Sequence, residues 1–312
     1  YKTALLAMHI TTSKTASKML YPLIKLTEYL GTHHPLFLIK LRYFVRFRRL
    51  PNLKNPKDLN EKILYLKLYT DTREWTRLAD KYRVREYIKE CGLSDILIPL
   101  YGVWDKASDI TLTNLPKSFI LKANNGDGKG SFLVVKDKEA ITLEEVKLQA
   151  NKWLSERNIG ALAAEPQYRN IPPRVLAEEL LEPELGSLID YKIWCFNGIP
   201  HSILTCSDRS NNSVALGAYD LNWNRLEDAL IPSKDYPAGE LLPRPENLSK
   251  MIDVAEKLSK PFPEVRVDLY DVNGRVYFGE LTFTSLGGMM LYYTPKALQE
   301  MGACVNLNHS NI

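Results

Sequence analysis

The sequence predicts an α+β protein in which antiparallel strands are covered by helices. Two observations support this prediction. Residues 190–209 and 264–283 each contain two apolar-rich strands joined by an Asn-Gly turn, which is the pattern of a β-hairpin. Elsewhere, segments such as 76–93 and 249–260 place apolar residues at helical spacing. The hydrophobic and charged fractions, 45% and 25%, are those of an ordinary globular protein.

Charge is distributed unevenly along the 312 residues. Residues 1–90 carry 19 Lys and Arg against 8 Asp and Glu, a balance of +11, whereas the whole chain has a formal net charge of +4. By subtraction the remainder is about −7, acidic enough to hold metal ions. The four cysteines form no C-x-x-C pair, and we interpret them as reduced thiols of a cytoplasmic protein. No apolar run of 18 residues predicts a membrane span.

The first 50 residues are predicted to be mostly helical. Residues 35–50, PLFLIKLRYFVRFRRL, contain no acidic residue. Their five cations are Lys40, Arg42, Arg46, Arg48 and Arg49. One interpretation is a helix with a buried face and a solvated basic face. The other is a surface helix that meets a membrane or an anionic glycan, which would place the protein peripherally on the inner face of the membrane.

The next segments alternate between helix and strand. Residues 55–69 begin with turn residues and continue as a helix, and residues 76–93 form a second helix that ends at Gly92. A further helix, 142–157, begins at Thr142 with a capping box completed by Glu145. Strands are predicted at 97–104, on both sides of the Gly-rich loop 124–130, and at 173–181.

The register of the hairpin 264–283 decides whether two carboxylates face each other. Asp268 and Glu280 are separated by eleven residues. A two-residue Asn-Gly loop pairs Val272 with Arg275 and puts the carboxylates on opposite faces of the sheet. A three-residue loop puts them directly opposite each other on one face. If the two carboxylates work together, we expect the odd-length loop, with Gly274 in a left-handed conformation.

Two carboxylates on rigid strands would suit a hard cation such as Mg²⁺. Arg266, two residues before Asp268, would neutralise charge on a transferring phosphoryl group. The alternative is a solvated sheet face with a salt bridge. Upstream, Lys122 ends a strand before a loop that contains Asn124, Asn125, Gly126 and Gly128. Such glycines let backbone N–H groups approach phosphate oxygens, although neither a P-loop nor a dinucleotide fingerprint is present.

The order of these motifs is more specific than any one of them. From about residue 50 to residue 300 the chain carries NPKDLNEKILYLKL, DKYRVREYI, LPKSFILKANNGDG, AEELL, DYKIWCFNG, RVD and GELTFTSLGG. In this order they resemble the ATP-grasp fold, and more narrowly its TupA-like branch, which is associated with teichuronopeptide and surface-polysaccharide biosynthesis. The resemblance implies two α+β subdomains that grip ATP, after a mainly helical, basic N-terminal region. The expected boundaries are 1–54, 55–110 (a pre-grasp domain), 111–180 and 181–312.

The resemblance also implies roles for individual residues. Lys81 and Lys122 would contact the phosphates of ATP, and the loop with Asn124, Asn125, Gly126 and Gly128 would fold over them. Glu178 or Glu179 would bind adenine or ribose, Asp190 would belong to the nucleotide site, and Lys192 would reach the nucleotide from the second subdomain. Asp268 and Glu280 would hold Mg²⁺, and Arg266 and Arg209 would stabilise the phosphoryl group. Thr282 stands where the wider fold has an Asn ligand, and a hydroxyl is the weaker ligand.

The expected activity is that of an ATP- and Mg²⁺-dependent ligase. It would join an amine to a carboxylate of a cell-surface glycan precursor through an acyl phosphate, which requires no protein nucleophile. Two rivals remain open: a kinase that phosphorylates a sugar hydroxyl, and a non-catalytic ATP-binding component of a glycan assembly complex. The aromatic residues Tyr191, Trp194 and Trp223 are interpreted as core residues, so no nucleic-acid partner is predicted.

Overall fold

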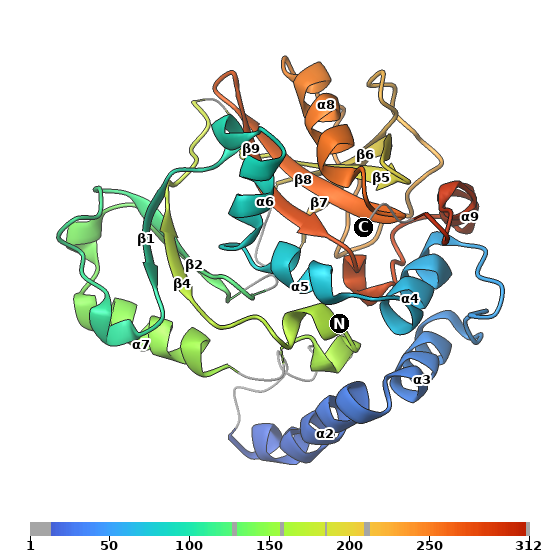
Figure 1. The fold of residues 1–312 in the computed structure, drawn as a ribbon, viewed down its shortest axis with the longest axis horizontal. Helices are drawn as coiled ribbons and strands as arrows, with labels where there is room; N and C mark the ends of the chain where they lie inside the picture. Colours follow the sequence, from blue (N-terminus) through green and yellow to red (C-terminus); the bar gives the residue numbers. More distant parts are fainter. Residues whose placement is uncertain (1–13, 127–129, 157–158, 185, 209–212, 310–312) are drawn as a thin grey trace.

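The computed structural model describes residues 14–126, 130–156, 159–184, 186–208 and 213–309 (Figure 1). Its strands form two antiparallel sheets, with the orders β1-β4-β2-β3 and β7-β6-β5-β8-β9, so the predicted α+β class is confirmed. The strands are β1 Leu100–Trp104, β2 Phe119–Ala123, β3 Phe132–Val135, β4 Val175–Glu178, β5 Asp190–Phe196, β6 Ile199–Ser207, β7 Ala215–Tyr219, β8 Glu264–Val272 and β9 Arg275–Thr282. The α-helices are α2 Lys14–His33, α3 Pro35–Phe47, α4 Leu59–Tyr69, α5 Arg73–Ala79, α6 Val84–Glu90, α7 Leu143–Ser155, α8 Leu248–Ser259 and α9 Pro295–Cys304.

The four-stranded sheet packs one face against α7. Every second residue of β2 is buried, and Phe119 and Leu121 share a core with Val146 and Trp153 of α7. The predicted capping box at the start of α7 is confirmed. β1, which lies inside the expected pre-grasp domain, pairs with β4 in this sheet. The sheet is therefore assembled from segments on both sides of residue 110.

The five-stranded sheet is covered on both faces. On one face, Ile193 and Val267 lie in a core with residues of α5, α6 and α8, including Val254. On the other face, Trp194 and Leu204 pack in a second core with residues of α4 and α9. In the view of Figure 1, α5 and α6 lie between the two sheets. These helices therefore lie between the sheet that carries Lys122 and the sheet that carries Asp268 (Figure 1).

The helices α2 and α3 lie at the edge of the molecule (Figure 1). α3 buries Leu38, Ile39 and Tyr43 against a small core that includes residues of α4. Gly31 of α2 approaches Ala161 so closely that an added Cβ would lie 1.7 Å from the Ala161 carbonyl oxygen. The prediction of helices in this region is confirmed. Within the described ranges, no helix combines the length and the apolarity that crossing a membrane requires.

One predicted helix is interrupted. Residues 76–93 do not form a single helix, because α5 ends at Ala79 and α6 begins at Val84. Between them, the Oδ1 atom of Asp80 accepts hydrogen bonds from the N–H of Tyr82 (2.9 Å) and from Asn124 (2.9 Å). Local side-chain hydrogen bonds of this kind compete with helical ones. The interruption turns the chain so that Lys81 lies beside the Gly-rich loop.

The hairpin of β8 and β9 corrects a second prediction. Its loop has two residues, since Val272 pairs with Arg275, and both Asn273 and Gly274 have positive φ, as a type I′ turn requires. The expected three-residue loop is therefore wrong, whereas the left-handed Gly274 is confirmed. Yet Asp268 pairs directly with Glu280, because the register shifts at a β-bulge where Gly279 is unpaired. The bulge thus adds the one extra residue that a three-residue loop would have provided.

Candidate active site

Glu178 is the centre of a charged cluster on the four-stranded sheet. It ends β4 and is 6% exposed, and Lys122 lies two residues along on the neighbouring strand β2. The Lys122 Nζ atom donates to Glu178 Oε2 at 2.9 Å, and Arg85 Nη1 of α6 donates to Glu178 Oε1 at 3.2 Å. Two cations therefore share one carboxylate. Arg85 was not among the predicted site residues, because the interruption between α5 and α6 determines where it points.

The root of the Gly-rich loop is held by Asn124. Its side-chain amide donates to Asp80 Oδ1 (2.9 Å) and to the Pro172 carbonyl (2.9 Å), and its Oδ1 atom accepts from the N–H of Arg174 (2.7 Å). The main chain adds a bond from the Lys81 N–H to the Asn124 carbonyl (3.0 Å). Asn124 is completely buried. Its side chain thus fastens the loop to the segment between α5 and α6 and to the chain before β4.

The three other predicted residues of the loop differ in their contacts. Gly126 accepts a hydrogen bond from Lys81 Nζ at 2.5 Å, and a Cβ at this position would lie 2.2 Å from the Ser131 Cβ. Asn125 is buried, and its Oδ1 atom has no hydrogen-bond partner within the described ranges. Gly128 lies outside the described residues.

Glu179, predicted with Glu178 for the nucleotide site, donates its N–H to the Pro99 carbonyl at 3.0 Å, which joins the end of β4 to the start of β1.

A second charged cluster lies on the five-stranded sheet around Asp268, which is 2% exposed. Arg266, on the same face of β8, donates from Nε to Asp268 Oδ1 (2.7 Å) and from Nη2 to Oδ2 (2.8 Å). Lys192 of the neighbouring strand β5 also bonds Oδ2 of Asp268, and its Nζ lies 3.5 Å from Asp190. The structure thus brings Asp190, Lys192, Arg266 and Asp268 together in one cluster.

The ionised form of this cluster is strongly favoured. Burial alone would raise the pKa of Asp268, but Arg266 and Lys192 hold that pKa below its usual value. Burial would likewise lower the pKa of Lys192 and of Arg266, and the attraction of Asp268 raises both instead. A bidentate contact between Arg and a carboxylate is among the strongest charged hydrogen bonds in proteins. The three groups therefore stay charged throughout the neutral pH range.

Glu280 and Thr282 extend the cluster along β9. Glu280 faces Asp268 across the strand pair, and its side chain is 43% exposed. Thr282 accepts from Arg266 Nη2 at 3.1 Å and donates to Glu280 Oε1 at 3.3 Å. The hydroxyl group therefore bridges the guanidinium and the exposed carboxylate. Arg209, also predicted for this site, lies outside the described residues.

Two further residues fix the position of Arg266. Its Nη1 atom donates to Ser285 Oγ at 2.7 Å, and its guanidinium lies over the ring of Trp194 at 5.7 Å from the ring centroid. Trp194 is buried, as predicted, and its Nε1 atom donates to the hydroxyl of Tyr293 at 2.8 Å. All the donors of Arg266 therefore point along one face of the sheet. The serine could be recognised in sequence only as part of SLGG, three residues after Thr282.

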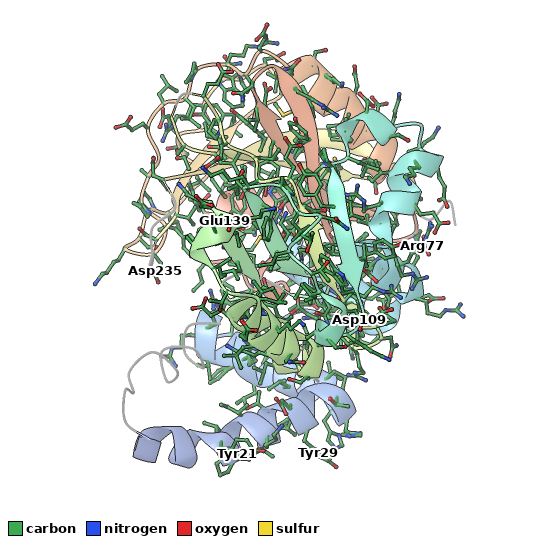
Figure 2. The ribbon with its side chains drawn as sticks, turned by 90° about the vertical axis from the view of Figure 1, so that its left-hand side faces the viewer. Tyr21, Tyr29, Arg77, Asp109, Glu139 and Asp235 are labelled. Atoms are coloured by element: carbon green, nitrogen blue, oxygen red, sulfur yellow. The ribbon has the colours of Figure 1, made fainter. Side chains whose placement is uncertain are left out.

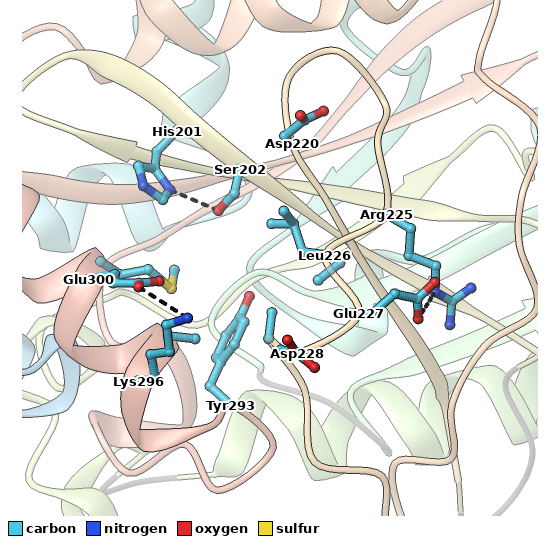
Figure 3. A pocket seen from close by; sticks show the side chains of 14 residues that line it. His201, Ser202, Asp220, Arg225, Leu226, Glu227, Asp228, Tyr293, Lys296 and Glu300 are labelled. Atoms are coloured by element: carbon cyan, nitrogen blue, oxygen red, sulfur yellow. Dashed lines mark hydrogen bonds and ion pairs between the residues drawn. The ribbon is translucent and has the colours of Figure 1, made fainter.

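Two cavities are lined by none of the residues of the two charged clusters. One, of about 530 Å³, lies between β6, β7 and α9 and is shown in Figure 3. Its charged groups are mostly paired with one another or with backbone, as in the pairs Lys296–Glu300 and Arg225–Glu227. The other, of about 520 Å³, lies between α3, α4 and the start of α9. In the described part of the chain, no group of three or more His, Cys, Asp or Glu side chains is arranged to hold a metal ion.

Comparison with known proteins gives a family match over most of the chain. A family model described as TupA-like ATPgrasp matches residues 61–305. No functionally curated protein matches the sequence. Similar solved structures include a D-alanine–D-alanine ligase from Bacillus anthracis, 17% identical over 73% of this chain and 66% of that one with a TM-score of 0.45. An N5-carboxyaminoimidazole synthetase from Staphylococcus aureus is 14% identical over 70% and 50%, with a TM-score of 0.41. The chain thus spans about half to two thirds of the length of these two proteins.

Proposed function

The chain belongs to the TupA-like ATP-grasp family, and on that premise we propose that it is an ATP- and Mg²⁺-dependent carboxylate–amine ligase. The observation that supports this most directly is the direct pairing of Asp268 with Glu280 beside Arg266 and Lys192. A site that transfers a phosphoryl group needs cations for its oxygens and carboxylates for a metal ion. Both kinds of group stand here on rigid strands rather than on loops.

The carboxylates fit a magnesium ion on the chemistry of their oxygens. A carboxylate offers about four acceptor positions, and Asp268 has three filled by Arg266 and Lys192. Glu280 is half-exposed, so its oxygens can reach an incoming ion. Magnesium keeps several ligands from water and phosphate, so two protein carboxylates are sufficient. When bound, the ion would supply charge neutralisation for the phosphoryl oxygens.

The cations of both clusters would exchange partners when the nucleotide binds. Lys122 and Arg85 are held by Glu178, and Lys192 and Arg266 are held by Asp268. Phosphate oxygens present the same kind of acceptor as these carboxylates. We expect Lys122 and Lys81 to bind the phosphates under the Gly-rich loop. Lys192 and Arg266 would neutralise the phosphoryl group, while Thr282 and Ser285 keep Arg266 oriented.

In the proposed reaction, a substrate carboxylate attacks the γ-phosphorus of ATP, which forms an acyl phosphate and releases ADP. An amine then attacks the acyl carbon, and the bond to the phosphate oxygen breaks, which leaves an amide and inorganic phosphate. The protein supplies orientation and charge, and no side chain has to form a covalent bond with the substrate. The acid or the amine would belong to a cell-surface polysaccharide precursor, a proposal that rests on the family.

The test is to incubate the protein with ATP, Mg²⁺, uronic-acid glycans and amino acids, and to follow phosphate release and product mass. Phosphate release that requires both acid and amine, with a product mass equal to condensation with loss of water, is the expected result. A stable phosphorylated product without free phosphate would instead identify a kinase. Nucleotide binding without turnover would identify a non-catalytic component. Glu246→Gln, at an exposed position that belongs to neither cluster, provides the matched control for substitutions of Asp268 and Glu280.

A further inference from the structure

Exposed apolar side chains are concentrated on α2, on α3 and at Leu50, just after α3. Of the 21 large apolar side chains that are exposed in the described part of the chain, ten lie between residues 21 and 50 and are 36 to 60% exposed. They are Tyr21, Leu23, Leu26, Tyr29, Leu36, Phe37, Leu41, Phe44, Val45 and Leu50. We call these ten side chains the α2–α3 apolar surface. Such a concentration on one pair of helices marks an interaction site rather than the ordinary scatter of exposed residues.

The two faces of α3 explain why this surface is separate from the core. Leu38, Ile39 and Tyr43 point into the protein. Phe37, Leu41 and Phe44 follow the spacing i, i+4, i+7 and so lie on one stripe, which is exposed. α3 is therefore apolar on both sides, although only one side packs against this chain. A helix of this kind needs a second apolar environment.

The same division holds in α2. Gly31 packs closely against Ala161, and Leu26 and Tyr29 are exposed on other sides of the helix. Figure 2 shows α2 at the edge of the molecule, with Tyr21 and Tyr29 on the side away from the sheets. The exposed residues of α2 and α3 thus belong to the same end of the protein. Tyrosine side chains are common where a protein meets the boundary between lipid and water.

The charges around this surface are mostly basic. Its one acid on α2, Glu28, is paired with Lys25 at 2.8 Å. Residues 29–57 contain seven Lys and Arg and no Asp or Glu. Lys40, Arg48, Lys54 and Lys57 are exposed, so they can meet an anionic partner. Arg42 and Arg46 are half-buried on the inner side of α3, where Arg42 bonds the Leu162 carbonyl. Arg49 is paired with Asp58 and Glu61, whereas Lys40, Arg48, Lys54 and Lys57 border the apolar surface as exposed cations.

We propose that the α2–α3 apolar surface docks on the surface of a bilayer that contains anionic lipid. Apolar side chains gain free energy by entering the acyl boundary, and Lys and Arg gain by approaching anionic headgroups. An anionic glycan would satisfy the cations but would leave the apolar side chains in water. A second copy of this chain would bring two basic faces together. The proposal is independent of the proposed ligase activity, since no residue of either charged cluster takes part.

The test is co-sedimentation of the full chain with vesicles of phosphatidylcholine alone and of phosphatidylcholine with phosphatidylglycerol. We expect binding to the anionic vesicles that weakens as salt is added. The double substitution Phe37→Ser with Phe44→Ser should weaken binding by about tenfold or more, because it removes two inserted rings. Lys40→Glu with Arg48→Glu should weaken it by at least about fivefold. The matched control is Leu148→Ser with Leu241→Ser, which removes two leucines elsewhere that are more exposed than Phe37 and Phe44 and should leave binding unchanged.

Three results would overturn the proposal. The first is that the wild-type chain stays in the supernatant with anionic vesicles. The second is that the phenylalanine variant binds as tightly as wild type. The third is self-association in the absence of vesicles that the phenylalanine variant abolishes, since this would assign the surface to a second copy. All substituted positions are exposed, and unchanged melting temperatures would show that the variants fold.

Discussion

Asp268 on β8 and Glu280 on β9 face each other because a single unpaired residue, Gly279, offsets the register that the Asn273-Gly274 turn sets. Without this bulge the tight turn would pair Asp268 with residue 279 and turn Glu280 to the opposite face of the sheet. The proposed metal site therefore depends on a backbone irregularity as well as on its two side chains. Bulges near functional sites commonly direct a side chain in this way.

The substitution Gly279→Ala tests the bulge. A Cβ at residue 279 would lie 2.9 Å from the Asp268 carbonyl oxygen and 3.2 Å from a ring carbon of Tyr270. We expect a loss of about 1–3 kcal/mol in the free energy of unfolding, because backbone must move. We also expect ATP turnover to fall by more than the folded fraction falls, because Asp268 and Glu280 lose their alignment. Chemical denaturation and phosphate release measure the two effects.

The control for this prediction is Gly274→Asn in the same hairpin. Gly274 has φ of +75°, and an added Cβ meets no atom within 4 Å. Asparagine tolerates this conformation, so the loss of stability should be only a few tenths of a kcal/mol and turnover should be retained. Equal losses of turnover in the two variants would show that the bulge has no special part in the site.

The two carboxylates should differ in what they contribute to folding. Asp268→Asn removes the carboxylate that the buried Arg266 and Lys192 share, which should cost about 3–5 kcal/mol. Glu280→Gln changes a half-exposed group and should alter stability by no more than about 0.5 kcal/mol. Both variants should nevertheless abolish ATP turnover. Full activity in Glu280→Gln, which folds normally, would show that the metal site is wrongly assigned.

Glu264 predicts an unusual dependence of stability on pH. Its carboxyl group is completely buried, and neither oxygen has a hydrogen-bond partner within the described ranges. Burial raises the pKa of Glu264 well above its usual value. A raised folded-state pKa means that its contribution to stability is fully present below the unfolded-state pKa and is lost as the pH rises through the folded-state pKa.

Glu264→Met should therefore stabilise the protein by about 1–3 kcal/mol near pH 8, because it removes a buried polar group without partners. The gain should shrink near pH 4.5, because the carboxyl group is then neutral in the folded protein and about half protonated in the unfolded chain, whose Glu pKa is about 4.3. Thermal unfolding at the two pH values measures the difference, and Glu246→Met, on the surface, should show no such trend. A variant that is destabilised equally at both pH values would indicate that Glu264 has a polar partner.

Lys67 should show the opposite trend. It donates to the carbonyls of Ala163 (2.9 Å) and Gly287 (2.8 Å), and burial lowers its pKa to about 8, with Glu165 opposing the shift. Because Lys67 has the lower pKa in the folded protein, the free energy of unfolding rises with pH between about 8 and 10.5, the range over which the unfolded chain still binds the proton and the folded protein has released it. Lys67→Met should cost about 1–3 kcal/mol, because two carbonyls lose their donor, and should flatten this rise. Unfolding curves of wild type and variant across that pH range measure both effects; a parallel rise in both would mean that Lys67 is not its source.

The elements that the sequence predicted are those with local signals. Both hairpins are marked by alternation and an Asn-Gly turn, and α7 by a capping box within four residues. Ala215–Tyr219 was missed because β7 is buried at every residue and so lacks alternation. α9 was also missed, although Thr294 caps it and Pro295 stands at its first turn, which are recognisable signals.

The features that escaped prediction depend on contacts between distant segments. The interruption between α5 and α6 is stabilised by Asn124, some 44 residues from Asp80. The bulge at Gly279 has the same character, since alternation along each strand is compatible with either register. The members of the site were identified through the resemblance of ordered motifs. Their pairing, such as Lys122 with Glu178, follows from the pairing of β2 with β4, which no local pattern specifies.

The cations of the proposed nucleotide site are all paired with acids of the protein, which affects the anions that they can bind. Lys122, Arg85, Lys192 and Arg266 each already have a carboxylate acceptor. An anion gains only the difference between its own attraction and that of the carboxylate it displaces. A singly charged ion such as chloride gains little from this exchange, whereas a polyphosphate engages several of these cations at once. For the proposed nucleotide site, the protein's own acids would therefore favour multivalent anions over monovalent ones.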